Sequence, residues 1–593
     1  MQARILTGLA LLALATAAAG NASATVPAWV TASNADTTRL LEAQAKFAPE
    51  EASDAGLTQY DGLAIDLGPD INARYIAAMQ IERDRVQARL ASEKDPQLRQ
   101  DLEILSASIV DDVTGTRLGE KYNLPWVDVP QLMFGNLQSL LQSQLPATRR
   151  GKALERLQRY TGLFPGSVPL VDQARARFTE RLAAPGLRGP VKARLEKSLS
   201  NVPTYIKGIR DLFASMKIAG AEPALAAMEK QLNDYAAWER AIVLPLARED
   251  FRLPPEMYAF RLRRFGIDID PQLLIQRAQV EFMETRAAMQ ALASVLAKEK
   301  GIAASDYHDV IRAMKKQTIA NDKLEAAYRQ VNTALEAAIR REGVVDVPNR
   351  PMIMRLASDA ESAAQPAPHM QPPPMIGNQG EQGQFVLPVG NPSAGGKEEA
   401  YDDFNYPAAA WTLSAHEGRP GHELQFSAMV ERGVSQARML YAFNSVNVEG
   451  WALYAEAEMV PSEPLEGQMI ALQFRLLRAA RAMLDPMLNL GLITREDAGR
   501  VLTGDVVLSP AMARQELDRY TFNSPGQAGS YFYGYSRILQ LRAETELALG
   551  PAFNRLAFNN FLLDQGLLPP DLLARAVRED FVPTRRPQPH KKP

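Results

Sequence analysis

Apolar residues recur at intervals of three and four positions over much of the first 250 residues, with charged residues between them. This spacing places the apolar side chains on one face of an α-helix. It predicts helices over 76–90, 97–110 and 222–241, separated by breaks such as Pro165-Gly166 and Pro185-Gly186. No strand-like alternation is sustained here, so this half of the chain is predicted to be helical.

Helical patterns continue in the second half. Asp270 before Pro271 predicts a helix start, because the aspartate can cap the helix and a proline needs no N–H in its first turn. This helix can extend to about Glu299, and a second is predicted from Asp322 to Arg341. Helices resume at Pro407 and continue almost to the end, so the fold class is mainly α.

The pattern changes between the two helical parts. Residues 351–396 are rich in proline, glycine, glutamine and asparagine, which is typical of a long surface loop. Within them, Gln384-Phe385-Val386-Leu387-Pro388 predicts a short strand. We favour a small β-sheet that flanks an active-site cleft.

The N-terminus has the layout of a secretory signal peptide over 1–24. Arg4 precedes an apolar run from Ile5 to about Ala19, and Ala22-Ser23-Ala24 forms a small-residue cleavage site. The run is shorter than the roughly 20 apolar residues of a membrane span. We therefore expect a periplasmic or secreted protein with no membrane association in the mature form.

The length of the chain bears on the number of lobes, and its net charge bears on the kind of partner. A chain of 593 residues exceeds the roughly 250–300 residues that one core can serve. We expect an N-terminal helical lobe over 25–255, a catalytic helical lobe over 256–582 and a disordered tail over 583–593. The formal net charge of -3 gives no indication of a nucleic-acid partner.

The chain has no cysteine, which excludes disulfides, thiolate metal ligands and a cysteine nucleophile. A bound metal would need histidine or carboxylate ligands. The five histidines are His308, His369, His416, His422 and His590. His308 is typical of a surface or capping residue, His369 lies in the proline-rich segment, and His590 lies in the tail.

Two histidines and a glutamate form a metal-site pattern, His-Glu-Gly-Arg-Pro-Gly-His over 416–422. In an unbroken helix, residues six apart point about 120° apart and could not share one ion. Pro420-Gly421 predicts a break that can return His422 to the side of His416. Glu417 would then be a general base rather than a ligand.

A third ligand is expected from the helix that follows. Zinc hydrolases often use two histidines and one glutamate, which leaves a fourth position for water. Glu449 lies 27 residues after His422, and Glu456 lies two helical turns further on. The glutamate that does not bind the metal could orient a histidine from behind.

A tyrosine-rich segment could stabilise the oxyanion of a hydrolytic transition state, because a phenol donates a hydrogen bond without being charged. Tyr531 and Tyr535 are four residues apart and share one helical face, so they are our candidates. Tyr520 and Tyr533 are the alternatives.

Three stretches in this order resemble the DUF885 family of bacterial proteins. They are 416–422, 449–456, and Pro525-Gly526-Gln527-Ala528 with Tyr531, and the resemblance as a whole covers roughly residues 35–580. That family is grouped with the zincin-like (gluzincin) metallopeptidases, so the resemblance implies a helical zincin-like fold and a zinc site. The stretch from Glu449 is also similar to the Asn-Glu-Gly-Phe-Ala stretch of zinc aminopeptidases, whose glutamate binds zinc, and this selects Glu449 over Glu456. Tyr533-Gly534-Tyr535 is similar to a tyrosine pair in thimet-type oligopeptidases. In metallopeptidases of the thermolysin type, an edge strand like 384–388 pairs with the substrate backbone.

These observations predict an exported metallopeptidase that hydrolyses short peptides with one Zn²⁺ ion held by His416, His422 and Glu449. Two alternatives stay open: a metal-dependent hydrolase of another ester or amide, and a non-catalytic helical binding protein that retains a metal site. An intact Glu417 argues against the second, because a structural site needs no base. The sequence has no Gly-x-Ser-x-Gly motif of a serine hydrolase.

Overall fold

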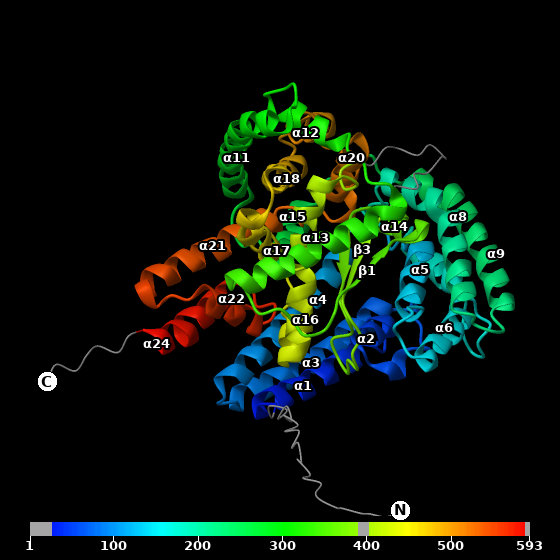
Figure 1. The fold of residues 1–593 in the computed structure, drawn as a ribbon. Helices are drawn as coiled ribbons and strands as arrows, with labels where there is room; N and C mark the ends of the chain where they lie inside the picture. Colours follow the sequence, from blue (N-terminus) through cyan, green and yellow to red (C-terminus); the bar gives the residue numbers. More distant parts are fainter. Residues whose placement is uncertain (1–25, 389–401, 587–593) are drawn as a thin grey trace, which may run out of the picture.

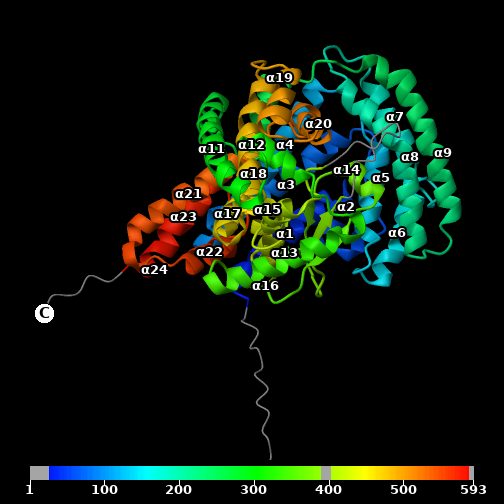
Figure 2. The ribbon, with the colours of Figure 1, turned by 45° about the horizontal axis from the view of Figure 1, so that its top comes forward.

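A computed structural model describes residues 26–388 and 402–586, and the predicted signal peptide lies outside them. The described chain is mainly helical and contains one small β-sheet (Figures 1 and 2). Within these ranges no helix combines the length and the apolar character that a membrane crossing requires.

The first nine helices form two groups. In Figures 1 and 2, α1–α4 lie beside one another and α5–α9 form a curved layer on the right. Their bounds are α1 Ala28–Gln44, α2 Pro49–Ala55, α3 Ile71–Ser92, α4 Pro96–Tyr122, α5 Val129–Leu140, α6 Ala147–Tyr160, α7 Leu170–Arg181, α8 Lys192–Ser215 and α9 Glu222–Trp238. The helices predicted over 76–90, 97–110 and 222–241 are thereby confirmed, the last continuing as the π-helical turn η2 Glu239–Val243.

The second half adds helices α10–α24. They are α10 Pro255–Arg264, α11 Pro271–Lys300, α12 Tyr307–Lys315, α13 Asn321–Glu342, α14 Asp359–Ala364, α15 Pro407–Glu417, α16 His422–Arg432, α17 Ser445–Met459, α18 Leu465–Asn489, α19 Arg495–Arg500, α20 Pro510–Asp518, α21 Ser530–Leu549, α22 Arg555–Asp564, α23 Pro570–Ala576 and α24 Val582–Arg585. The predicted start of α11 is confirmed, because the Asp270 side chain accepts a hydrogen bond from the backbone N–H of Gln272. Of the expected disordered tail, the part up to Arg585 is helical, and residues 587–593 lie outside the described chain.

The sheet has three strands, β1 Ile353–Leu356, β2 His369–Gln371 and β3 Gln384–Leu387, in the order β1-β3-β2. The strand predicted over 384–388 is confirmed. Its expected place at the sheet edge is wrong, because β3 pairs with β1 on one side and with β2 on the other. With both sides hydrogen-bonded, β3 has no free backbone to offer a peptide. The edge strand β2 lies against α16 instead.

The buried apolar side chains form separate clusters. One belongs to α5–α9 and extends to Ala360 of α14. A second spans residues 258–533 and lies around α11, α15 and α18. Helices α1, α3 and α4 pack instead on Ala437 of the π-helical turn η4 Ala437–Tyr441. The N-terminal helices are thus joined to the C-terminal half by shared apolar contacts.

Helices α17 and α21 approach each other backbone to backbone. A methyl group on Gly534 would lie 2.0 Å from the carbonyl oxygen of Val446, and one on Gly450 would lie 2.6 Å from the carbonyl carbon of Gly534. Only glycine fits at both positions. This contact sets Glu449, which precedes Gly450, at a fixed distance from the residues of α21.

We predict that Gly534→Ala lowers the melting temperature, because the added methyl group forces the two backbones apart. Overpacking of this kind costs about 1–3 kcal/mol. The matched control is Gly135→Ala in α5, where a methyl group would meet nothing within 4 Å. That variant should be unchanged or slightly more stable, since alanine favours a helix by about 1 kcal/mol over glycine. Equal thermal unfolding of both variants would contradict the tight contact.

Candidate metal centre

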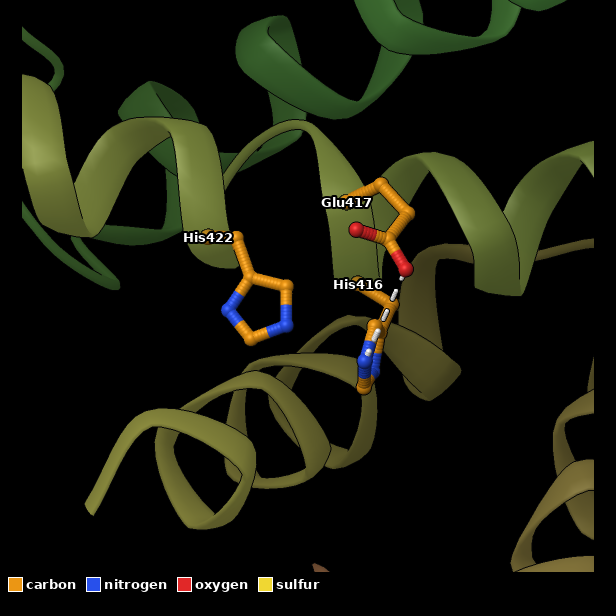
Figure 3. A group of neighbouring side chains, drawn as sticks. All are labelled: His416, Glu417 and His422. Carbon is orange, nitrogen blue, oxygen red and sulfur yellow. Dashed lines mark ion pairs between the residues drawn. The ribbon is translucent and has the colours of Figure 1, made fainter. Parts of the chain in front are cut away.

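The turn between α15 and α16 places the two histidines side by side. Helix α15 ends at Glu417 and α16 begins at His422, so the predicted break at Pro420-Gly421 is confirmed. A methyl group on Gly421 would lie 1.9 Å from the carbonyl oxygen of His416, which leaves room only for glycine. The imidazole rings lie 4.7 Å apart between centroids and almost perpendicular to each other (Figure 3).

Side chains from other elements hold this turn in place. The indole N–H of Trp451 in α17 donates to the carbonyl oxygen of Pro420 at 3.0 Å. The buried guanidinium of Arg419 donates to Glu423 at 2.6 Å and to the carbonyl oxygen of Arg350 at 2.7 Å. The separation of the histidines is therefore fixed by tertiary contacts as well as by the turn.

Glu449 of α17 faces both histidines. Its Oε2 lies 3.3 Å from Nε2 of His422 and 3.5 Å from Nε2 of His416. This oxygen is buried and makes no hydrogen bond. Leaving such an atom unpartnered is costly. Three ligand atoms that converge in this way could hold one divalent metal ion, and the orphaned oxygen fits that use.

Glu417 also lies at the cluster, on the last turn of α15 (Figure 3). His416, His422 and Glu417 can each bring a ligand atom within 4.8 Å of the others, so distance alone would admit Glu417 as a ligand. Its Oε1, however, lies 3.9 Å from Nε2 of His416, farther than Oε2 of Glu449. This position suits a base better than a third ligand.

Glu456 orients His416 from behind. Its Oε1 lies 2.5 Å from Nδ1 of His416 and accepts a hydrogen bond from Arg478 at 2.9 Å, while Oε2 accepts one from Thr412 at 2.9 Å. Burial raises the pKa of Glu456, but Arg478, His416 and Thr412 outweigh it and lower that pKa. An ionised Glu456 can only accept, so Nδ1 of His416 carries a proton, and Nε2 is the nitrogen that a metal ion could bind in place of a second proton.

The cluster is electrostatically prepared for a cation. Burial would lower the pKa of His416, but Glu449, Glu456 and Glu417 raise it to about 9. Burial would also raise the pKa of Glu449, yet the two imidazoles hold it well below its ordinary value. Both shifts arise from the close approach of carboxylates and imidazoles in the cluster. A divalent metal ion would neutralise the same carboxylates.

Of the two candidate tyrosines, the structure brings Tyr531 to the histidines. Its ring lies parallel to that of His416, with 6.2 Å between centroids. Its hydroxyl accepts a hydrogen bond from Nη2 of Arg519 at 2.7 Å. Tyr535 lies one turn further along α21, where the guanidinium of Arg475 covers its ring at 5.5 Å.

The alternative tyrosines are engaged elsewhere. The Tyr520 hydroxyl donates to Glu516 at 2.7 Å. The Tyr533 hydroxyl donates to Asp268 and accepts from Arg537. Neither hydroxyl contacts His416 or His422 in these interactions, so the geometry favours Tyr531.

The remaining histidines differ in their distance from the cluster. His369 lies on β2, and its Nδ1 donates to the carbonyl oxygen of Ala367 at 3.0 Å. Burial lowers the pKa of His369, and nearby Glu417 opposes this effect. His308 lies at the start of α12 with Nδ1 2.5 Å from the capping Asp306. His590 lies outside the described residues.

Sequence reasoning missed the polar residues that support the cluster. Gln527 accepts from Arg519 at 2.9 Å, and its amide nitrogen donates to Ser445 and lies 3.5 Å from Oε1 of Glu449. Arg478 holds Glu456. One signal was available: Arg475, Arg478 and Arg481 recur every three residues on an otherwise apolar helix.

Fold and cluster together define a mainly helical protein with a buried histidine–glutamate site in its C-terminal half. The family described as "Bacterial protein of unknown function (DUF885)" matches residues 49–577. The chain therefore belongs to the DUF885 family. No curated protein matches it.

Two solved structures share the fold. One is "The crystal structure of the putative lipoprotein from Colwellia psychrerythraea", with a TM-score of 0.72 and 17% identity over 94% of this chain and 100% of that chain. The other is "The structure of a putative lipoprotein of unknown function from Shewanella oneidensis", with a TM-score of 0.68 and 18% identity over 93% and 100%. At such identities the likeness concerns the fold alone.

We predict that Glu456→Gln weakens divalent-metal binding about 10- to 100-fold, because an amide orients His416 less firmly and removes a charge behind it. The matched control is Glu458→Gln on the same helix, whose carboxylate pairs with Arg542 and Arg555 instead. Metal titration of both variants, with circular dichroism to verify folding, tests this. A folded Glu456→Gln variant with wild-type affinity would remove the supporting role of Glu456.

Proposed function

We propose that this protein is an exported, zincin-like metallopeptidase that uses one Zn²⁺ ion held by His416, His422 and Glu449. Ligand atoms roughly 2.0–2.1 Å from a tetrahedral zinc ion lie about 3.3–3.4 Å from one another. The separations of 3.3 Å and 3.5 Å between Glu449 Oε2 and the two imidazole nitrogens agree with this value. That agreement is the observation that carries the proposal.

The donor set suits catalysis better than a purely structural role. Two imidazoles and one carboxylate leave a fourth coordination position for water. A zinc ion held by these three residues would act as a Lewis acid and would bring the pKa of a water in the fourth position near neutrality. The residues of the chain supply the remaining functions: orienting the ligands, moving the proton and stabilising charge on the substrate.

Glu417 is the proposed general base. It follows the ligand His416 directly, and its Oε1 lies 3.9 Å from Nε2 of that histidine. A carboxylate beside the cluster, but outside the set of three ligands, can take a proton from the attacking water. It can then deliver the proton to the departing amine.

Tyr531 is the proposed donor to the oxyanion, and we prefer it to Tyr535. Its hydroxyl accepts from Arg519, so its own proton is free to point elsewhere. Burial raises the pKa of Tyr531 while Arg519 opposes this rise, and the phenol stays protonated at neutral pH. A neutral donor held rigidly by an arginine is suited to stabilising charge that develops only in the transition state.

Export and short peptide substrates complete the proposal. The signal-peptide pattern of residues 1–24 supports export, and the two structures of the same fold carry titles that describe lipoproteins. The imidazoles and the Glu449 carboxylate are 13% exposed or less. An extended peptide reaches such a buried site more easily than a folded protein does.

We predict that Glu417→Gln retains zinc but loses at least about 100-fold in peptide hydrolysis, the range for removal of a general base. A peptide library followed by mass spectrometry gives the activity, and metal analysis gives the zinc content. The control is Glu466→Gln, which alters a surface ion pair with Lys300 and should leave both values unchanged. Equal turnover by the Glu417→Gln variant and the wild type would refute the mechanism, and turnover of esters alone would redirect it.

Removal of the metal should also destabilise the protein, because the buried carboxylates around His416 lose their cation. We predict that chelation, or His422→Ala, lowers both the melting temperature and the activity, and that added zinc restores the chelated wild type but not the variant. His308→Ala is the control, since this residue lies at a distant helix end. Chelation without effect on stability or activity would contradict a bound metal.

A further inference from the structure

A cavity of about 430 Å³ lies apart from the histidine cluster. Its walls come from the C-terminal ends of α4 and α7, residues 188–194 at the start of α8, residues 248–253 with α10, and the π-helical turn η7 Arg519–Asn523 with Pro525. It therefore lies where the N-terminal helices meet the C-terminal half, a common location for ligand sites. None of its lining residues is His416, His422 or Glu449.

The charged residues of this cavity are almost all positive. Five arginines line it against one carboxylate, that of Glu120: they are Arg181, Arg188, Arg194, Arg248 and Arg261. The whole chain carries a net charge of -3. This concentration of positive charge is therefore a local feature and does not follow from composition.

Four of these arginines are held by backbone carbonyl oxygens. Arg181 donates to the carbonyl of Glu120 and Arg188 to that of Arg252, both at 2.9 Å. Arg248 donates to Gly189 at 3.1 Å and also to Asp250, and Arg261 donates to Pro525 at 3.0 Å. Among the described residues, no carboxylate oxygen pairs with any of the five within 4.0 Å. The carbonyls orient the guanidinium groups but leave their charge uncompensated.

The cavity walls remove part of the water around these arginines: Arg181, Arg188, Arg248 and Arg261 are half-buried, whereas Arg194 is exposed. Burial and the neighbouring Arg188 lower the pKa of Arg248 to about 10, although Asp250 acts in the opposite direction. Burial likewise lowers the pKa of Arg261, despite Asp485. A cluster of like charges in a partly enclosed cavity is stabilised when an anion binds among them.

We propose that this arginine-lined cavity binds a small organic anion that carries a phosphate or a pair of carboxylates together with an apolar group. Guanidinium groups bind both kinds of oxyanion through paired hydrogen bonds. Trp126, Met257 and Phe522 also line the cavity and offer apolar contact. Arg194 already lies over the ring of Trp126 at 5.3 Å, so anionic and apolar contacts adjoin. The volume suits a small molecule.

The test is calorimetric titration of the full chain with two probes, phenyl phosphate and phthalate, which differ in the oxyanion and share an aromatic ring. Phenol is the uncharged control. The site predicts saturable binding of one equivalent of at least one probe and none of phenol. Binding of phenyl phosphate alone would assign a phosphate ligand, and binding of phthalate alone a dicarboxylate.

Variants separate this cavity from other anion sites. Arg194→Met and Arg248→Met should each weaken binding roughly tenfold or more, the loss expected for one charged hydrogen bond. Glu120→Gln should strengthen binding, because it removes the only acidic side chain in the wall. Arg39→Met, at a side chain 63% exposed on α1, is the control. His422→Ala should bind both probes normally, which excludes capture by a metal.

Two results would overturn the proposal. The first is the absence of saturable binding of either probe to the wild type. The second is binding that neither arginine variant weakens. If an arginine variant fails to fold, Glu120→Gln still decides, since unchanged or weaker affinity in that variant places the anion elsewhere.

Discussion

The backbone turn between α15 and α16 is the constraint on which the histidine–glutamate cluster depends. A side chain at Gly421 would collide with the carbonyl oxygen of His416, so the chain can return this closely only at glycine. Trp451 and Arg419 then fix the turn from outside. Because Trp451 lies two residues after Glu449, the helix that holds the turn also delivers the carboxylate. The glycine contact between α17 and α21 extends this rigid unit to Tyr531.

Charge balance governs the interior around this unit. Two buried carboxylates there have arginine partners: Arg478 holds Glu456, and Arg481 binds Glu516 through two hydrogen bonds at 2.8 and 2.6 Å. Removing one member of such a pair leaves a buried charge, which costs far more than the pair contributes. Glu449 differs, because its inner oxygen has no hydrogen bond. The arginine-lined cavity is the opposite case, with half-buried or exposed guanidinium groups that have no carboxylate within 4.0 Å among the described residues. We propose ligands at these two places.

Local signals were sufficient for most elements and for part of the site. Apolar periodicity located α3, α4 and α13, and Asp270-Pro271 marked the start of α11. The short apolar run at 384–387 indicated a strand, but its central place in the sheet depends on β1 and β2, which pair with it from elsewhere in the chain. The choice between Tyr531 and Tyr535 also required the structure, since both share a helical face and only packing distinguishes them.

By itself the sequence determined which residues can carry the chemistry, because five histidines and no cysteine leave few candidate metal ligands. It also marked the helix break between the two histidines, at Pro420-Gly421. The tertiary structure decided which glutamate faces both imidazoles and which lies behind His416. Glu449 and Glu456 lie on the same helix, and only the packing of that helix against the turn gives them these different positions. The tertiary structure alone assembled the five arginines of the arginine-lined cavity, which come from separate segments between residues 181 and 261. Periodicity and spacing act within one segment, whereas a site built from several segments exists only after they pack.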